Sequence, residues 1–459
     1  MKARNAWGAI AGLVVVGLAV QGCSSDSTDD GAATPSASTG EQKIDGAGKT
    51  LHVMIAANGL YPEEQKAWFG QVSEQFQKET GAKVAFETFA SGNDELTKIQ
   101  TSVLSGQGPD VYSLGTTFTP TAYATGAFVT LGDDEWAKVG GRDRFVESTL
   151  GISGPDAEHE VGIPFASRPF VMAYNKDLLT AAGIAEPPTT WDDLTADAKK
   201  LTKGDVHGLA IGYADGFDPW KFIWGMSIQA GNPILDLEAG KAQINVPATQ
   251  KAYETYFGWY SNDKVVDPAS IGWTNAQAVA AFADGKAGFV PMVSATSRVT
   301  LDKSSVAGKY AYALMPTIPP GQTSTPAGGK PASSIISGDN MVVAKYSKQQ
   351  DLSFALIKML TSSENQQAYY KTFGDLPTNA EAAAAVQGGD ALLAPVLDSS
   401  SKAVGTPFSG AWGDTQLALT NVVVQALPAL KGGGVSAGDL TKALTGAESA
   451  AQSSLDKAE

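Results

Sequence analysis

Aromatic and polar side chains are interleaved in the segment from Asp218 to Trp224, which reads Asp-Pro-Trp-Lys-Phe-Ile-Trp. Flat aromatic rings pack against the C–H faces of a pyranose ring, and planar polar groups bond its neighbouring hydroxyls. Neither kind of contact alone fixes a polyol in water. The combination of Asp218 with Trp220 and Trp224 therefore predicts non-covalent binding of a carbohydrate.

Residue patterns for covalent catalysis are scarce by comparison. The sequence of 459 residues holds three histidines, His52, His159 and His207, and a single cysteine, Cys23. It contains no His-Glu-x-x-His or Walker motif. Asp and Glu are plentiful, so a carboxylate pair for glycoside hydrolysis stays open as an alternative. We expect a binding protein rather than an enzyme, without a cofactor or a metal.

The N-terminus has the features of a secretion signal. A basic start at Lys2 and Arg4 precedes an apolar stretch from Ala9 to Val20, and small residues then lead to Cys23. The apolar stretch is too short for a stable membrane span. Residues 20–23 resemble a bacterial lipobox, which implies removal of residues 1–22 and a diacylglycerol anchor on the Cys23 thiol. An ordinary signal peptide with an incidental cysteine is the alternative.

Residues 23–48 predict a flexible tether, because they are rich in Ser, Asp, Thr, Gly and Ala. The folded part then begins near Lys49, and its roughly 410 residues are enough for two domains. The formal net charge of −15 is unlike the basic footprint of a nucleic-acid-binding protein. We expect the chain on the extracytoplasmic face of the bacterial cell membrane, with no nucleic-acid partner.

The first part of the folded chain alternates between strand and helix patterns. Apolar runs at 51–57, 82–89 and 110–114 predict strands, and amphipathic segments from Pro62 to Gly81 and from an N-cap at Asn93 to Gly106 predict helices. This order indicates a parallel sheet covered by helices, an α/β fold. Ligands of such sheets sit beyond the carboxyl ends of the strands, here residues 58–61 and 115–119.

The rest of the chain repeats this mixture. Residues 316–331 are rich in Pro and Gly and predict a loop that connects two lobes. Further helices are predicted at 177–183, 191–201, 249–259, 276–284, 352–360, 363–373 and 415–427.

Several segments resemble, in order, the bacterial extracellular solute-binding proteins of ABC importers, a family that includes the maltodextrin-binding proteins. The resemblance covers most of residues 50–455. The segments that carry it are residues 105–115, 123–131, 162–165, 174–179, 182–183, 187–194, 282–288, 314–316, 337–341, 360–366 and 374–377.

The resemblance implies a periplasmic-binding-protein-like fold, in which two α/β lobes joined by hinges close over a ligand in the cleft between them. By analogy, hinges lie near residues 164–168, 314–316 and 374–377. Lobe 1 would then comprise residues 49–165 and 316–374, and lobe 2 residues 166–315 and 375–459. The implied function is capture of a mono- or oligosaccharide and its delivery to the permease subunits of the importer.

The resemblance also implies roles for individual residues. Asp218 and Trp220 match an acid-Pro-aromatic ligand segment of the family, and Trp224 extends that match. Trp412 resembles a tryptophan of the family's cleft, with core packing as the alternative. Arg168 stands where relatives place a polar cleft residue, often an acid. An arginine there leaves open a non-sugar ligand such as a glycerophosphodiester, a peptide or an iron chelate.

The remaining candidates for ligand binding come from predicted strand ends and loops. Helix capping and simple turn chemistry are the alternatives for the threonines and for the last three residues of this set, and Trp273 fits either a cleft or a core position. The set is Asn58, Tyr61, Thr116, Thr117, Phe118, Trp273, Ser337, Asp339 and Asn340.

Overall fold

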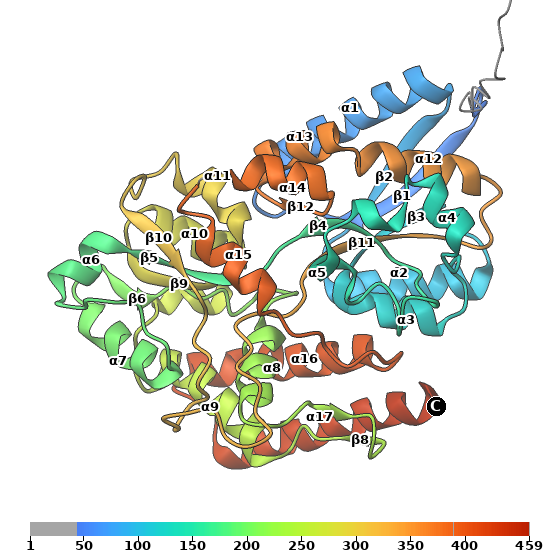
Figure 1. The fold of residues 1–459 in the computed structure, drawn as a ribbon. Helices are drawn as coiled ribbons and strands as arrows, with labels where there is room; N and C mark the ends of the chain where they lie inside the picture. The colour runs from blue at the N-terminus through green and yellow to red at the C-terminus, as the bar shows by residue number, and fades with distance from the viewer. Residues whose placement is uncertain (1–43, 389, 459) are drawn as a thin grey trace, which may run out of the picture. The chain divides into compact units, whose positions relative to one another are not determined.

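The computed structural model describes residues 44–388 and 390–458. Cys23, the signal segment and all of the expected tether but its last residues lie outside the described residues. Within the described part the fold is mixed α/β, with one six-stranded and one four-stranded sheet (Figure 1). We call the larger sheet and its helices the first lobe. The smaller sheet and the helices that pack with it form the second lobe.

The larger sheet has the strand order β12-β4-β11-β3-β1-β2. As predicted, β1 is parallel to both β2 and β3. β11 runs antiparallel to β3 and β4, and β12 runs antiparallel to β4. The strands are β1 (Thr50–Ala56), β2 (Lys83–Phe89), β3 (Val111–Gly115), β4 (Ile163–Ser167), β11 (Gly338–Val343) and β12 (Leu376–Pro377).

Strand β1 has buried side chains on both faces, as its apolar run predicts, although His52 is exposed. Leu51, Val53 and Ile55 pack into one cluster of buried side chains. Met54 points the other way and belongs to a second cluster. Successive side chains of a strand alternate between faces, so helices must cover both sides of this sheet.

Helices do cover both sides: Figure 1 shows α1, α12 and α13 on one side and α2 and α3 on the other. The second predicted helix begins slightly earlier than expected, because Ser91 rather than Asn93 is its N-cap and accepts a hydrogen bond from the Asp94 amide. The helices of this lobe are α1 (Pro62–Thr80), α2 (Gly92–Ser105), α3 (Thr119–Ala124), α4 (Asp133–Lys138), α5 (Glu147–Leu150), α12 (Gln350–Leu360), α13 (Ser363–Phe373) and α14 (Ala380–Gln387).

The smaller sheet has the strand order β10-β5-β9-β6. Its strands are β5 (Val171–Asn175), β6 (His207–Leu209), β9 (Ala287–Val293) and β10 (Tyr310–Ala313). The helices around it are α6 (Lys176–Ala181), α7 (Trp191–Leu201), α10 (Asn275–Ala283), α11 (Arg298–Leu301) and α15 (Ala394–Ser401).

A group of helices completes the second lobe, since α8 packs on α9 and α16, and α16 packs on α17 (Figure 1). Asp218 is the N-cap residue of α8, and residues 219–224 form the first half of this helix. α16 begins at Trp412, three residues before the predicted start at Thr415. The four helices are α8 (Pro219–Gln229), α9 (Pro247–Ser261), α16 (Trp412–Lys431) and α17 (Ala437–Ala458).

The chain crosses between the lobes at places that differ from two of the expected boundaries. The loop predicted at residues 316–331 is present and extends to residue 337, but Ala332 and Ile335 pack into the core of the second lobe. β12 pairs in the larger sheet, and α14 packs on α13. The chain therefore returns to the larger sheet at Gly338 and leaves it after α14. A loop-forming composition marks a connection but does not reveal which core it packs against.

Candidate ligand-binding cleft

A cleft of about 440 Å³ is lined by segments from both lobes. The first lobe contributes the loop after β1, the turn after β3 and the start of β11. The second lobe contributes the segment before α8, the first residues of α10, the end of β9 and one face of α16. Its volume lies in the range of about 300–1,000 Å³ that is usual for small-molecule sites.

The loop after β1 is held by an asparagine turn. The Asn58 side-chain oxygen accepts hydrogen bonds from the Leu60 and Tyr61 amides at 3.0 and 2.9 Å. This turn directs Tyr61 across the cleft, where its hydroxyl donates to the Thr296 carbonyl at 2.5 Å and lies 3.1 Å from Thr300 Oγ1. Burial raises the pKa of Tyr61, so the hydroxyl keeps its proton.

The turn after β3 is the 3-10 segment η1 (Thr116–Phe118). Thr116, Thr117 and Phe118 are each less than a tenth exposed and line the cleft. The threonines do not act as helix caps, because Gly115 occupies the N-cap position and has no side chain. Instead Thr116 Oγ1 donates to the Ile336 carbonyl at 2.9 Å, which ties the turn to the approach to β11.

Arg168 lies between two buried carboxylates. Its Nε donates to Asp375 at 2.6 Å, and both of its terminal nitrogens donate to Asp339. Its backbone amide also donates to the Ser337 carbonyl at 2.8 Å. Gly338 has a φ of +152°, and a side chain there would overlap the Ala166 carbonyl, so β11 approaches β4 closely beside this ion-pair group.

Burial governs the protonation of these groups. Desolvation raises the pKa of Asp375 to about 6, with Arg168 acting in the opposite direction. Desolvation also raises the pKa of Asp339, again against the effect of Arg168. For Arg168, desolvation lowers the pKa, but the two carboxylates outweigh it and the net shift is upward. Arg168 therefore stays charged and paired with Asp339 and Asp375.

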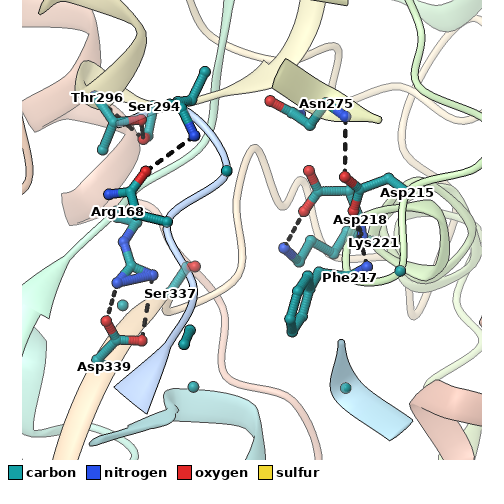
Figure 2. Close-up of a pocket in the computed structure, with 18 of the residues that line it drawn as sticks. Arg168, Asp215, Phe217, Asp218, Lys221, Asn275, Ser294, Thr296, Ser337 and Asp339 are labelled. Atoms are coloured by element: carbon teal, nitrogen blue, oxygen red, sulfur yellow. Dashed lines mark hydrogen bonds and ion pairs between the residues drawn. The ribbon is translucent and has the colours of Figure 1, made fainter. Parts of the chain in front are cut away.

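A second charged group lies at the start of α8. Asp215 accepts hydrogen bonds from the amides of Phe217, Asp218 and Asn275 at 2.8, 3.0 and 2.9 Å. Asp218 in turn pairs with Lys221 at 2.5 Å. Figure 2 shows this group and the Arg168–Asp339 pair well apart, at the right and left of the view. Burial, and then repulsion from Asp218, raises the pKa of Asp215.

Trp220 is the aromatic residue of α8 that lines the cleft, although only 4% of it is exposed. Phe118 and Tyr61 add aromatic surface from the first lobe. The structure thus brings together ten of the predicted residues in one cleft, and Ser337 and Asp339 lie beside Arg168. The ten are Asn58, Tyr61, Thr116, Thr117, Phe118, Arg168, Asp218, Trp220, Ser337 and Asp339.

Four predicted site residues do not line this cleft. Trp224 is 2% exposed in the core of the second lobe, one helical turn beyond Trp220. Trp412 is fully buried in the same core. Trp273 packs against the other core cluster of that lobe. Asn340 points to the opposite face of β11 from Asp339, and its amide donates to Thr119 Oγ1 at 3.0 Å.

Sequence reasoning missed a stripe of residues on α16. Gln416, Leu417 and Thr420 line the cleft, and their spacing places them on one face of the helix. The polar residues Gln416 and Thr420, four apart on either side of the apolar residues 417–419, were a signal in the sequence. Other lining residues were not singled out, namely Glu95, Asp215, Phe217, Lys221, Thr274, Asn275, Ser294, Thr296, Ser297, Tyr369 and Asp375.

Two other kinds of functional feature are absent from the described part of the chain. Residues 44–388 and 390–458 contain no cluster of three His, Cys, Asp or Glu side chains placed to hold a metal ion. No helix within those ranges is both long and apolar enough to cross a membrane.

The comparison with known proteins agrees with this architecture. The sequence profile described as "Bacterial extracellular solute-binding protein" matches residues 71–394. The chain is 27% identical to the diacetylchitobiose-binding protein DasA of Streptomyces coelicolor over 414 residues, which cover 88% of each protein.

Solved structures of similar fold include a solute-binding protein of Thermotoga lettingae bound to alpha-D-tagatose, with a TM-score of 0.72 and 19% identity over 89% of this chain and 100% of that one. Maltose-bound MalE3 of T. maritima has a TM-score of 0.70 and 22% identity, over 89% of this chain and 99% of its own. The matched profile spans well over half of the chain, and the chain therefore belongs to the bacterial extracellular solute-binding proteins.

Proposed function

We propose that this chain is the lipid-anchored substrate receptor of a bacterial ABC importer and that it captures a sugar in the cleft between its lobes. The cleft composition carries this proposal. Trp220, Phe118 and Tyr61 offer flat apolar surface, while hydroxyl, amide and carboxylate groups surround them. A sugar needs this combination of stacking surface and planar hydrogen-bonding groups.

The arrangement of the site supports capture by lobe closure. A ligand in the cleft contacts both lobes at once, so it binds a closed state more tightly than an open one and shifts the population toward closure. The hinges of this motion would lie where the chain passes between the sheets, near β4, β11 and the segment after α14. The importer's permease subunits would then recognise the closed receptor.

An sn-glycerol-3-phosphate-binding protein of Yersinia enterocolitica is similar to only 25% of this chain. The relative and the two solved structures described above, which cover most of it, bind sugars: diacetylchitobiose for the Streptomyces protein, and tagatose and maltose for the two structures. These ligands support the substrate class but leave the individual sugar open. The guanidinium of Arg168 is already paired with Asp339 and Asp375. That pairing weakens the alternative of an anionic ligand, for which Arg168 was the supporting residue.

Thermal shift of the full chain in detergent solution tests the substrate class. A ligand at about 100 times its dissociation constant adds about 2.7 kcal/mol to apparent stability. Neutral mono- and disaccharides should raise the melting temperature, and no hydrolysis product should appear on prolonged incubation. A shift caused by glycerophosphodiesters or peptides, with none from any sugar, would overturn the sugar assignment. Released monosaccharide would instead favour an enzyme.

A further inference from the structure

The charges that line the cleft are strongly unbalanced. Among the described residues, five carboxyl side chains line it, those of Glu95, Asp215, Asp218, Asp339 and Asp375. The cationic side chains that line it are Arg168 and Lys221. Burial raises the pKa of the Glu95 carboxyl well above its usual value, against the effect of the Gly115 amide, and the four aspartates alone already outnumber the two cations.

Both cations are already neutralised by the protein. Arg168 is held between Asp339 and Asp375. Lys221 pairs with Asp218 at 2.5 Å, and its ammonium lies 4.6 Å from the centre of the Phe170 ring. A ligand carboxylate or phosphate would therefore have to compete with these acids for a cation, and it would also meet their repulsion.

A buried acceptor without a donor lies on the cleft wall together with a buried carboxyl, and it points to a ligand that donates. Gln416 is 2% exposed, and its side-chain oxygen has no hydrogen-bond partner among the described residues. Glu95 is also 2% exposed, and its carboxyl accepts a hydrogen bond from the Gly115 amide at 3.2 Å. A buried acceptor without a donor costs about 1–3 kcal/mol, so a donating ligand gains by satisfying it.

We infer that the cleft selects a sugar that carries a protonated amino group, such as an unacetylated hexosamine or an oligomer of it. This inference rests on the proposed sugar-receptor function. An ammonium brings three N–H donors and one positive charge, whereas a hydroxyl brings one donor and no charge. A charge of that kind restores the balance of a cleft whose acids outnumber its cations.

Binding of matched sugars tests the inference directly. Isothermal titration of the full chain in detergent solution would compare glucose, glucosamine, N-acetylglucosamine and glucuronate, and then the same four substituents on a β-1,4-linked disaccharide. We expect the amine to bind about ten- to thirtyfold more tightly than its neutral parent, the gain from one positive charge in a partly screened cleft whose acids outnumber its cations. The acid should bind most weakly.

The outcomes distinguish a failure of the amine preference from a failure of the sugar-receptor function. If the neutral parent or the acetylated sugar binds as tightly as the amine, or the acid binds tightest, the amine preference is wrong while the sugar receptor stands. If no sugar of either set binds, the sugar-receptor function itself fails. Raising the NaCl concentration from 50 to 500 mM should weaken amine binding several-fold and leave neutral binding unchanged, because salt screens the charge.

Two variants locate the effect in the cleft. Glu95→Gln keeps the shape and an oxygen for the Gly115 amide but cannot ionise beside a bound ammonium, so amine affinity should fall about tenfold, and by more than the affinity for the neutral parent. Glu254→Gln, at an exposed position of α9, is the matched control. Equal amine affinity in the parent and both variants would overturn a role for Glu95.

Gln416→Met keeps the test decisive if Glu95→Gln does not fold. It removes the unpartnered acceptor without a large change in volume, so the melting temperature without ligand should not fall. Amine affinity should still fall. Unchanged amine affinity in this variant would remove Gln416 from the recognition of the amine.

Discussion

The indole ring of Trp412 stands edge-on to that of Trp220, with ring centroids 5.7 Å apart and an angle of 75° between the planes. Trp220 borders the cleft and Trp412 lies behind it, fully buried. The two tryptophans therefore pack against each other, with Trp220 lining the cleft and Trp412 in the core. Substitutions at the two positions should have different consequences.

Trp412→Ala should destabilise the folded chain by about 3–5 kcal/mol, because it opens a cavity in the core of the second lobe. Urea unfolding without ligand measures this loss. Trp220→Ala should cost ligand affinity by roughly tenfold to several hundredfold, the effect of lost stacking and lost apolar area. Titration with the tightest sugar of the thermal-shift screen measures that loss. A Trp412 variant of parental stability and much reduced affinity would contradict the assignment of Trp412 to the core.

The positions of Asn58, Tyr61 and Thr116 at the cleft could be predicted from sequence. Carboxyl ends of neighbouring parallel strands meet at one edge of a sheet, and β1 and β3 are such neighbours. Residues just after those strands must therefore lie together, whatever their side chains do locally.

The depth of a side chain could not be predicted in the same way. Trp220 and Trp224 share one face of a helix, so their spacing does not tell which end of the helix reaches the cleft. Asp339 and Asn340 are neighbours whose side chains point to opposite faces of β11. Gln416 lines the cleft only because α16 packs beside α2 and α3, a long-range contact that leaves little trace in local sequence.

Stability should depend on pH through Asp375, whose pKa is raised by burial from 3.8 to about 6. Between about pH 4 and pH 6 the folded chain holds a proton on this carboxyl that the unfolded chain has released. The contribution of this group to the free energy of unfolding therefore falls as pH rises through that window, by on the order of 2–3 kcal/mol, and is constant above it.

Asp375→Asn should remove this dependence, since the amide does not titrate. Urea unfolding at pH 4, 5, 6 and 7 would show a smaller loss of stability with rising pH in the variant than in the parent. Asp134→Asn, at an exposed position of α4, serves as the control and should follow the parent curve. Parallel curves for all three proteins would contradict the assignment.

Cys23→Ala should release the protein from the membrane fraction and leave its sugar affinity unchanged, because the expected anchor and the folded part are separated by the polar segment 23–48. Fractionation of cells, followed by titration of the released protein, measures both properties. Cys23→Ser provides a second variant without a thiol. Membrane retention equal to that of the parent would defeat the lipobox assignment.

Tyr61→Phe should weaken the closed arrangement of the lobes. The Tyr61 hydroxyl, from the first lobe, donates to the Thr296 carbonyl and lies beside Thr300, both in the second lobe. Each net hydrogen bond is worth about 0.5–1.5 kcal/mol, so its loss should shift the population toward an open state by a factor of about 2 to 12. Small-angle scattering should then show a larger radius of gyration for the ligand-free variant than for the ligand-free parent. Sugar affinity should fall by up to a similar factor, because a smaller fraction of the ligand-free protein is in the closed, binding-competent state. Tyr260→Phe is the matched control, since its hydroxyl donates to the Pro268 carbonyl within the second lobe at 3.3 Å. If both variants keep the parental radius and affinity, the contact between Tyr61 and the second lobe does not govern closure.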